Sequence, residues 1–164
     1  MIPTIKRILY ATDLSESARH AFGYAADLAR RYDARLTVIS VLESFSPFTE
    51  AQIKDMMGHE EWDKLKAEQS DRSRAKIKER VTEFCAEMER RIESCSLMVD
   101  DIRIPQGMPH LEILKAAEEI KADLIVMGTY GHNILPNAII GSTARRLVKD
   151  STVPVMVIPL PDDL

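Results

Sequence analysis

The sequence predicts an α/β fold in which one doubly wound, five-stranded parallel sheet carries helices on both faces. Four short apolar runs are nearly continuous rather than alternating, and such runs are typical of parallel strands that helices cover on both sides. Segments with helical spacing separate these runs, so strands and helices alternate along the chain. We expect the strand order 3-2-1-4-5, with the first strand in the centre, and a single domain spanning residues 1–164.

The expected strands follow the apolar runs. Four of them lie at residues 7–11, 36–41, 124–127 and 153–158. A fifth run, residues 98–104, alternates more between apolar and polar side chains, and we expect it toward an edge of the sheet.

The expected helices begin at residues suited to helix starts. Ser15 can cap a helix that runs to about Tyr32, and Pro109 fits the first turn of a helix through about Ile120. The last helix is expected at residues 141–150. In the helix that begins at Pro109, apolar residues at helical spacing predict one buried face, made of Leu111, Leu114, Ala117 and Ile120.

The segment from residue 43 to about residue 76 is longer than a crossover between strands needs. An apolar stripe beyond it predicts a long helix over residues 73–94, and the polar residues 66–76 fit an exposed or mobile helix. An apolar cluster within the segment fits satellite core or a dimer contact, with a lid as the alternative. Its members are Phe45, Pro47, Phe48, Met56, Met57 and Trp62.

Charge and cysteine content exclude several classes of protein. The net charge of −4 at pH 7 argues against general nucleic-acid binding, which basic patches drive. No apolar run approaches the ~20 residues of a membrane span, and the first residues lack a secretory signal pattern. Cys85 and Cys95 are separated by about 15 Å of expected helix, too far for a disulfide between them. We expect a cytoplasmic protein with reduced cysteines and no membrane or nucleic-acid partner.

The most informative motif joins three glycines to a Ser-Thr pair. Gly128 and Gly131 follow an apolar strand, and after nine intervening residues Gly141, Ser142 and Thr143 open a helix. Glycines let the backbone approach an anion, and a helix start offers free N–H groups and the positive end of the dipole. Taken alone, Gly128 could simply form a turn, and Ser142 and Thr143 could simply cap the helix. The complete arrangement of strand, glycines, Ser-Thr pair and helix predicts phosphate binding. The sequence has neither a GxxxxGK[ST] loop nor a GxGxxG after the first strand.

The predicted topology places other candidate residues near this loop. In a doubly wound sheet, ligands bind outside the carboxyl ends of the strands, where the strand order reverses. Asp13 follows the first strand, Val41 closes the second and Gly128 follows the fourth. An acidic side chain there is suited to ribose hydroxyls or a base amine, and a strand-end backbone can pair with an adenine edge.

These motifs, together with the run from Ala11 to Ser15 and the segment Val153-Pro-Val-Met-Val, resemble the universal stress protein family over essentially the whole chain. Members with the complete glycine pattern bind ATP, so the resemblance implies an ATP-binding stress-response regulator or switch, with Mg²⁺ or Mn²⁺ as a possible companion of the nucleotide. The implied contacts to adenosine and phosphates are Thr12, Asp13, Val41, Met127, Gly128, Gly131, His132, Gly141, Ser142 and Thr143. The nine residues 132–140 lack glycine, lysine and arginine, so the phosphates are expected to be held less tightly than usual.

The sequence offers little for fast catalysis. His20, His59 and His110 form no metal or catalytic spacing, and His132 fits an exposed loop residue or, when protonated, a phosphate contact. We find no general base beside the expected terminal phosphate, so we name no catalytic residue, and slow hydrolysis with metal-bound water is the most we expect. A slow ATP hydrolase or phosphotransferase and a nucleotide-independent interaction protein remain the alternatives.

The last strand, from Val153 to Ile158, predicts self-association. Pro154 is tolerated in an edge strand, and an apolar edge invites pairing with a second copy. The family resemblance also implies a homodimer through this strand. The alternative is a monomer whose edge is covered by residues 159–164.

Overall fold

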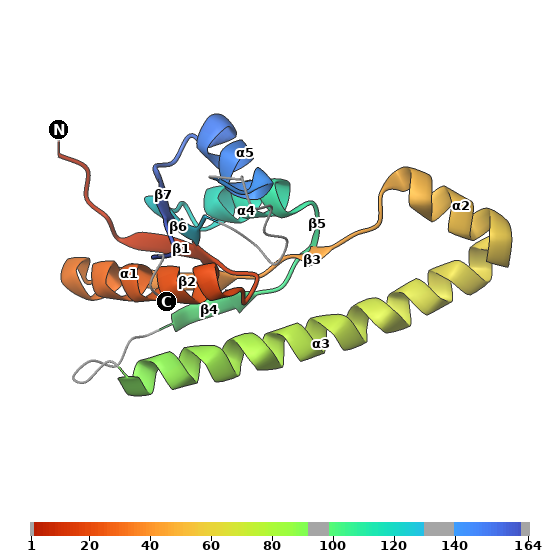
Figure 1. Ribbon diagram of the computed structural model, residues 1–164, viewed down its shortest axis with the longest axis horizontal. Helices are drawn as coiled ribbons and strands as arrows, with labels where there is room; N and C mark the ends of the chain where they lie inside the picture. Colours follow the sequence, from red (N-terminus) through yellow and green to blue (C-terminus); the bar gives the residue numbers. More distant parts are fainter. Residues whose placement is uncertain (1, 92–98, 130–139, 162–164) are drawn as a thin grey trace.

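The computed structural model describes residues 2–91, 99–129 and 140–161, and its centre is a five-stranded parallel sheet (Figure 1). The strands are β1 (Arg7–Ala11), β2 (Arg35–Ile39), β4 (Val99–Arg103), β6 (Leu124–Gly128) and β7 (Val155–Ile158). They lie in the order β4-β2-β1-β6-β7, and all four neighbouring pairs are parallel. Counted along the chain, this is the order 3-2-1-4-5, so the predicted fold class is confirmed.

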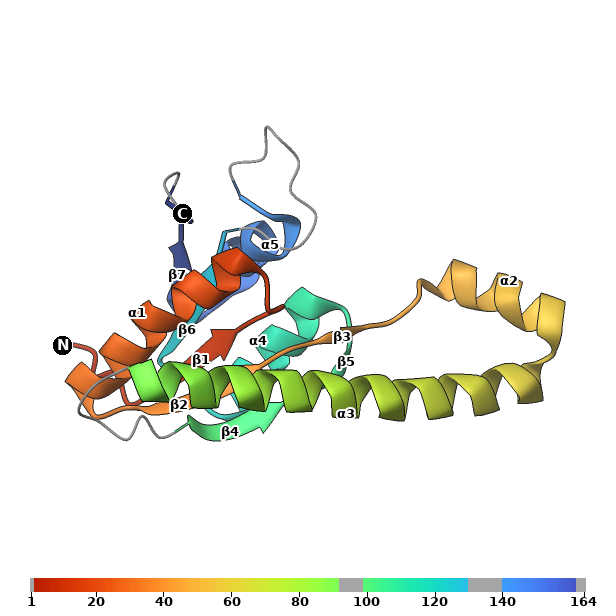
Figure 2. The ribbon, with the colours of Figure 1, turned by 60° about the horizontal axis from the view of Figure 1, so that its bottom comes forward.

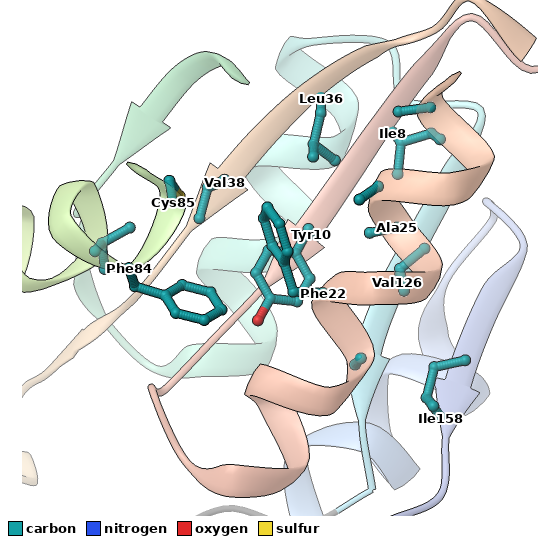
Figure 3. Packing of buried hydrophobic residues seen from close by; sticks show 14 of the residues in the cluster. Ile8, Tyr10, Phe22, Ala25, Leu36, Val38, Phe84, Cys85, Val126 and Ile158 are labelled. Carbon is teal, nitrogen blue, oxygen red and sulfur yellow. The ribbon is translucent and has the colours of Figure 1, made fainter. Parts of the chain in front are cut away.

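One face of the sheet is covered by α1 (Glu16–Tyr32) and the C-terminal half of α3 (His59–Arg91). Phe22 of α1 lies between Tyr10 of β1 and Phe84 of α3, with ring centroids 5.2 and 5.1 Å apart in edge-to-face contacts (Figure 3). The Tyr10 hydroxyl donates to the carbonyl of Ala18 at 2.5 Å. These contacts hold α3 next to α1 on the same face of the sheet.

The other face carries α4 (Pro109–Glu119) and α5 (Ser142–Asp150). The buried residues of α4 are Ile113, Ala116 and Ala117, whereas Leu111 is 51% exposed. The prediction that Leu111 belongs to the buried face is therefore wrong. The chain offers two overlapping apolar stripes at helical spacing here, and packing against the sheet selects the one through Ile113.

The segment after β2 forms an arm, which we define as residues 44–76. It contains α2 (Pro47–Met57) and the N-terminal part of α3, and it projects from the sheet (Figures 1 and 2). The helix predicted at 73–94 begins at residue 59 instead, and residues 66–76 are helical and largely exposed, as expected.

The apolar cluster predicted within the arm does not form a satellite core. Trp62 is buried against Phe45, with ring centroids 5.8 Å apart, but Phe48 is 73% exposed and Met56 88%. The reason is that α2 packs on α3 rather than on the sheet, and a pair of helices has no third layer to cover its outer side.

A second, two-stranded parallel sheet was not predicted. It pairs β3 (Leu42–Glu43) with β5 (Gln106–Gly107) just beyond the carboxyl ends of β2 and β4. The strand expected at 36–41 ends at Ile39, so Val41 lies between β2 and β3.

Among the described residues, no helix is long and apolar enough to cross a membrane.

Candidate functional site

A cleft of about 530 Å³ opens at the carboxyl ends of β1, β2 and β6. This volume lies within the range of about 300–1,000 Å³ that is typical of small-molecule and cofactor sites. Its walls come from the loop after β1, the β2–β3 connection, α3, α4, the end of β6 and the start of α5. The lining residues are Ala11, Thr12, Asp13, Leu14, Ala18, Ile39, Ser40, Val41, Leu42, Glu43, Ile77, Arg80, Pro109, Ile113, Met127, Gly128, Thr129, Gly141, Ser142, Thr143 and Ala144.

The loop between β1 and α1 is shaped by its own side chains. The Thr12 hydroxyl accepts from the Leu14 amide at 3.0 Å, and Oδ1 of Asp13 accepts from the Ser15 amide at 2.9 Å. Leu14 adopts a positive φ of 62°, which these two bonds help to hold. A carboxylate has acceptor sites on both oxygens, so the exposed Asp13 side chain can hold the loop and still accept from a ligand.

Val41 sits where the chain passes from the main sheet to the small one. The amides on either side are engaged, Ser40 with the Arg103 carbonyl at 3.0 Å and Leu42 with the Pro105 carbonyl at 2.8 Å. Within the part of the chain that the structure describes, the amide and carbonyl of Val41 bond to no other group. This backbone can therefore pair with the edge of a base, which presents a donor and an acceptor side by side.

Gly128 is required by the approach of α1 to the end of β6. A Cβ at this position would lie 2.5 Å from Oγ, 2.7 Å from the carbonyl carbon and 2.8 Å from the carbonyl oxygen of Ser17. Only glycine allows this contact, because two of the three atoms belong to backbone. Gly128 thus lines the cleft and also sets how closely the first turn of α1 can approach it.

Thr129 joins three segments at the cleft floor. Its amide donates to Oγ of Ser17 at 3.0 Å and to the Ile158 carbonyl at 3.1 Å. Its carbonyl accepts from the Gly141 amide at 2.7 Å. The two flanks of the glycine motif are therefore held together, and the Gly141 amide is already engaged within the protein.

Among the described residues near the motif, the amides that remain available are those at the start of α5. Gly141 is the N-cap, and its carbonyl accepts from the Arg145 amide at 3.0 Å, so helical bonding begins one turn in. The amides of Ser142, Thr143 and Ala144 belong to the first turn, which has no intrahelical acceptor. All three residues line the cleft, and the positive end of the helix dipole faces an anion placed there.

A second hollow of about 260 Å³ adjoins the cleft at this end. The two share Glu43, Pro109, Ser142 and Thr143. The hollow adds His110 from the first turn of α4 and Arg146 from α5. The end of the cleft near α5 therefore leads toward the guanidinium of Arg146 and the imidazole of His110.

The acidic and basic side chains among the described lining residues of the main cleft are Asp13, Glu43 and Arg80. Among residues 2–91, 99–129 and 140–161, no group of three or more His, Cys, Asp or Glu side chains could hold a metal ion. A polyphosphate in this cleft would thus meet helix-start amides and whatever cation accompanies it, rather than a preformed metal cage.

The structure brings together all of the predicted site residues that it describes. Eight of the ten line the same cleft, while Gly131 and His132 lie outside the described residues; their roles in binding remain predictions. The sequence analysis missed Ile77 and Arg80 of α3, and also Glu43. No local signal marks Arg80, because it stands in a polar stretch and its position depends on how α3 crosses the sheet.

Comparisons with known proteins agree with this fold. The sequence matches the universal stress protein family over residues 4–159. Universal stress protein MJ0531 from Methanocaldococcus jannaschii is 30% identical over 159 residues, covering 95% of this chain and 83% of that protein. Protein MJ0577 from the same organism superposes with a TM-score of 0.70 at 24% identity, covering 98% of this chain and 99% of its own. UspA from Lactobacillus plantarum gives 0.63 at 25% identity, with 96% and 99% covered.

A further solved relative is a universal stress protein in complex with cAMP, with a TM-score of 0.53, 20% identity and coverage of 97% and 100%. The family match runs from before β1 to the end of β7 and so includes every described segment that lines the cleft. The chain belongs to the universal stress protein family.

Proposed function

We propose that the protein binds ATP in the cleft and acts as a stress-response regulator whose conformation or assembly depends on the bound nucleotide. One observation carries the proposal. Three segments far apart in the chain, after β1, after β2 and at the start of α5, meet around one cleft of cofactor size. Each brings a group of the kind that a different part of ATP needs.

In this proposal the adenosine lies at the end of the cleft formed by Asp13 and Val41. The Val41 backbone pairs with the adenine edge, and the Asp13 carboxylate accepts from the ribose hydroxyls. A structural relative crystallised with cAMP, which is also an adenine nucleotide, supports this class of ligand. Met127 at the end of β6 supplies an apolar surface beside the sugar.

The phosphates then extend toward the start of α5. Ser142 and Thr143 donate from their backbone amides and hydroxyls, and Arg146 and His110 lie in the adjoining hollow. A triphosphate brings more negative charge than these groups offset, so we expect Mg²⁺ or Mn²⁺ to bind with the nucleotide and to be held largely by its phosphates.

A thermal-shift titration with Mg-ATP and ADP tests the proposal. Ligand at 100 times its dissociation constant stabilises the folded protein by about 2.7 kcal/mol, which is readily measured as a rise in melting temperature. Asp13→Asn keeps an oxygen for the Ser15 amide but removes the charge, and we expect about tenfold weaker binding or more. Asp100→Asn, exposed on β4, is the matched control. No shift of the wild-type protein at millimolar ATP would refute nucleotide binding.

Phosphate release over hours, with Mg²⁺ or Mn²⁺ present, tests whether ATP is also turned over. For a regulator we expect release that is slow compared with nucleotide exchange. Rapid release that stops when Gly141 is replaced by a bulky residue would favour the hydrolase alternative. We place the protein in the cytoplasm, where ATP is abundant and thiols stay reduced.

We further propose that the protein forms a homodimer through β7. This strand is at an edge of the sheet, and Met156 on it is exposed. In an antiparallel pair of β7 strands, Met156→Glu would place like charges close together across the two-fold axis. Light scattering after gel filtration should show a dimer for the wild type and a monomer for Met156→Glu. Met56→Glu, on the arm, should stay dimeric; a monomeric wild type would refute the proposal.

A further inference from the structure

The residues that flank the arm at its two ends line the cleft. The chain leaves the cleft at Glu43, forms α2 and the outer part of α3, and returns to the cleft at Ile77 and Arg80. α3 contacts β3, so departure and return lie next to each other. Figure 2 shows α3 as one continuous helix that passes beside β3 and extends beyond it.

Arg80 is the feature of this wall that the proposed function leaves unused. It is the basic residue among the described side chains that line the main cleft, and it is exposed there. Within the described residues it takes part in no hydrogen bond or ion pair. Two other cations of this region are engaged: Lys66 bonds to Glu50 at 2.7 Å, and the Arg19 guanidinium lies 4.9 Å from the centre of the Phe84 ring.

The position of α3 identifies the part of a ligand that Arg80 can reach. α3 packs against β4 and β3, toward the β4 edge of the sheet, and β3 begins at the residue after Val41, whereas α5 packs against α4 and β7, toward the opposite edge. The cleft extends between these two helices. A nucleotide with its phosphates at Ser142 therefore presents its base, not its phosphates, to α3.

We propose that α3 forms the base wall of the nucleotide site, with Ile77 packing against the purine and the Arg80 guanidinium stacking on its ring. The proposal rests on the nucleotide binding proposed above. A guanidinium is planar, weakly hydrated and well suited to stacking on a base, which a lysine is not. Ile77 is half-buried against the core on the sheet face that α1 covers, and so gives the base a fixed apolar surface.

Isothermal titration with Mg-ATP and with adenosine tests this assignment. Arg80→Ala should weaken both ligands by about the same factor, roughly three- to tenfold, because the lost contact is to the part that they share. Lys78→Ala removes a positive charge two residues away, from an exposed side chain that does not line the cleft, and should leave both affinities unchanged.

The two ligands separate the possible failures. If Arg80→Ala leaves adenosine affinity unchanged, or weakens ATP alone, Arg80 does not contact the base and the inference is overturned. If the wild-type protein binds neither ligand, the proposed function itself fails. Because Arg80 is exposed, the variant should fold normally, which its urea midpoint checks.

Discussion

Replacing Gly128 by alanine tests how the sheet and α1 together build the cleft. The added Cβ would lie 2.5–2.8 Å from three atoms of Ser17, closer than real Cβ contacts allow. Two of these atoms are backbone atoms in the first turn of α1, so a side-chain rotation cannot relieve the clash. The first turn must move away from β6, and the loop containing Asp13 moves with it.

The loss of folding stability expected for Gly128→Ala follows from the added methyl group and from the hydrogen bond that it disturbs. Extra methyl groups in a packed interior typically cost about 1–3 kcal/mol, and the buried hydrogen bond from the Thr129 amide to Ser17 is disturbed as well. For a chain of this size, 1 kcal/mol corresponds to about 2–4 °C in melting temperature. We therefore expect Gly128→Ala to melt several degrees lower and to bind ATP more weakly.

Urea unfolding followed by circular dichroism measures the effect, and the chain supplies a matched control. Gly23 lies within α1, and a Cβ added there would have no atom within 4 Å, so Gly23→Ala should stabilise the protein by about 0.5–1 kcal/mol. Ser17→Ala should not rescue Gly128→Ala, since the backbone atoms stay in place. A Gly128→Ala protein as stable as the wild type would refute the close approach.

Two further predictions concern single side chains. Glu50 accepts from Lys66 at 2.7 Å and from the Trp62 indole at 3.4 Å, and the hydrogen bond from Lys66 is the main cause of its lowered pKa. A lowered folded-state pKa gives stabilisation that is present above the unfolded-state pKa and lost as pH falls through the folded-state pKa. Trp62 emission of the wild type should therefore change only in acid, whereas the emission of Glu50→Gln should differ from that of the wild type already at neutral pH. Identical spectra of the two proteins at neutral pH would contradict this. Burial raises the pKa of the Cys85 thiol to about 11, so a thiol reagent at pH 8 should label Cys85 slowly until the protein unfolds, and fast labelling that Cys85→Ser abolishes would contradict the burial.

The main sheet could be predicted because buried parallel strands leave a strong local signal. Each central strand is a run of apolar residues, and the run at β6 is buried at every position. The small β3–β5 sheet has two residues in each strand, too few to show any period. Its formation depends on the Ser40 amide meeting Arg103, at the end of β4, and the Leu42 amide meeting Pro105 just beyond it, contacts that only the folded chain brings about.

The start of α3 was missed for a different reason. Residues 59–72 carry no apolar stripe, and the helix there is favoured by residues of high helix propensity such as Glu, Lys, Ala and Gln. Periodicity reports packing, and this part of the helix packs on little besides α2. Propensity summed over the segment would have extended the prediction back to residue 59, whereas the apolar pattern placed the start of the long helix at residue 73, with residues 66–76 expected only as an exposed or mobile helix.

The residues of the candidate site also fall into those that the sequence predicts and those that it does not. Asp13, Val41 and Gly128 stand at the ends of strands, and the topology rule places such positions at one edge of the sheet. Ile77 and Arg80 enter the cleft from the middle of a helix, where lateral position is decided by the Phe22–Phe84 and Val81 packing. That packing cannot be worked out from the spacing of residues along one helix.

A crystal structure of the protein grown with Mg-ATP tests the central claim most directly. The account predicts one nucleotide in each chain, with the adenine edge on the Val41 backbone, the ribose at the Asp13 carboxylate and the phosphates against Ser142 and Thr143. Electron density for the nucleotide elsewhere on the surface, or a cleft that stays empty at saturating ATP, would contradict it.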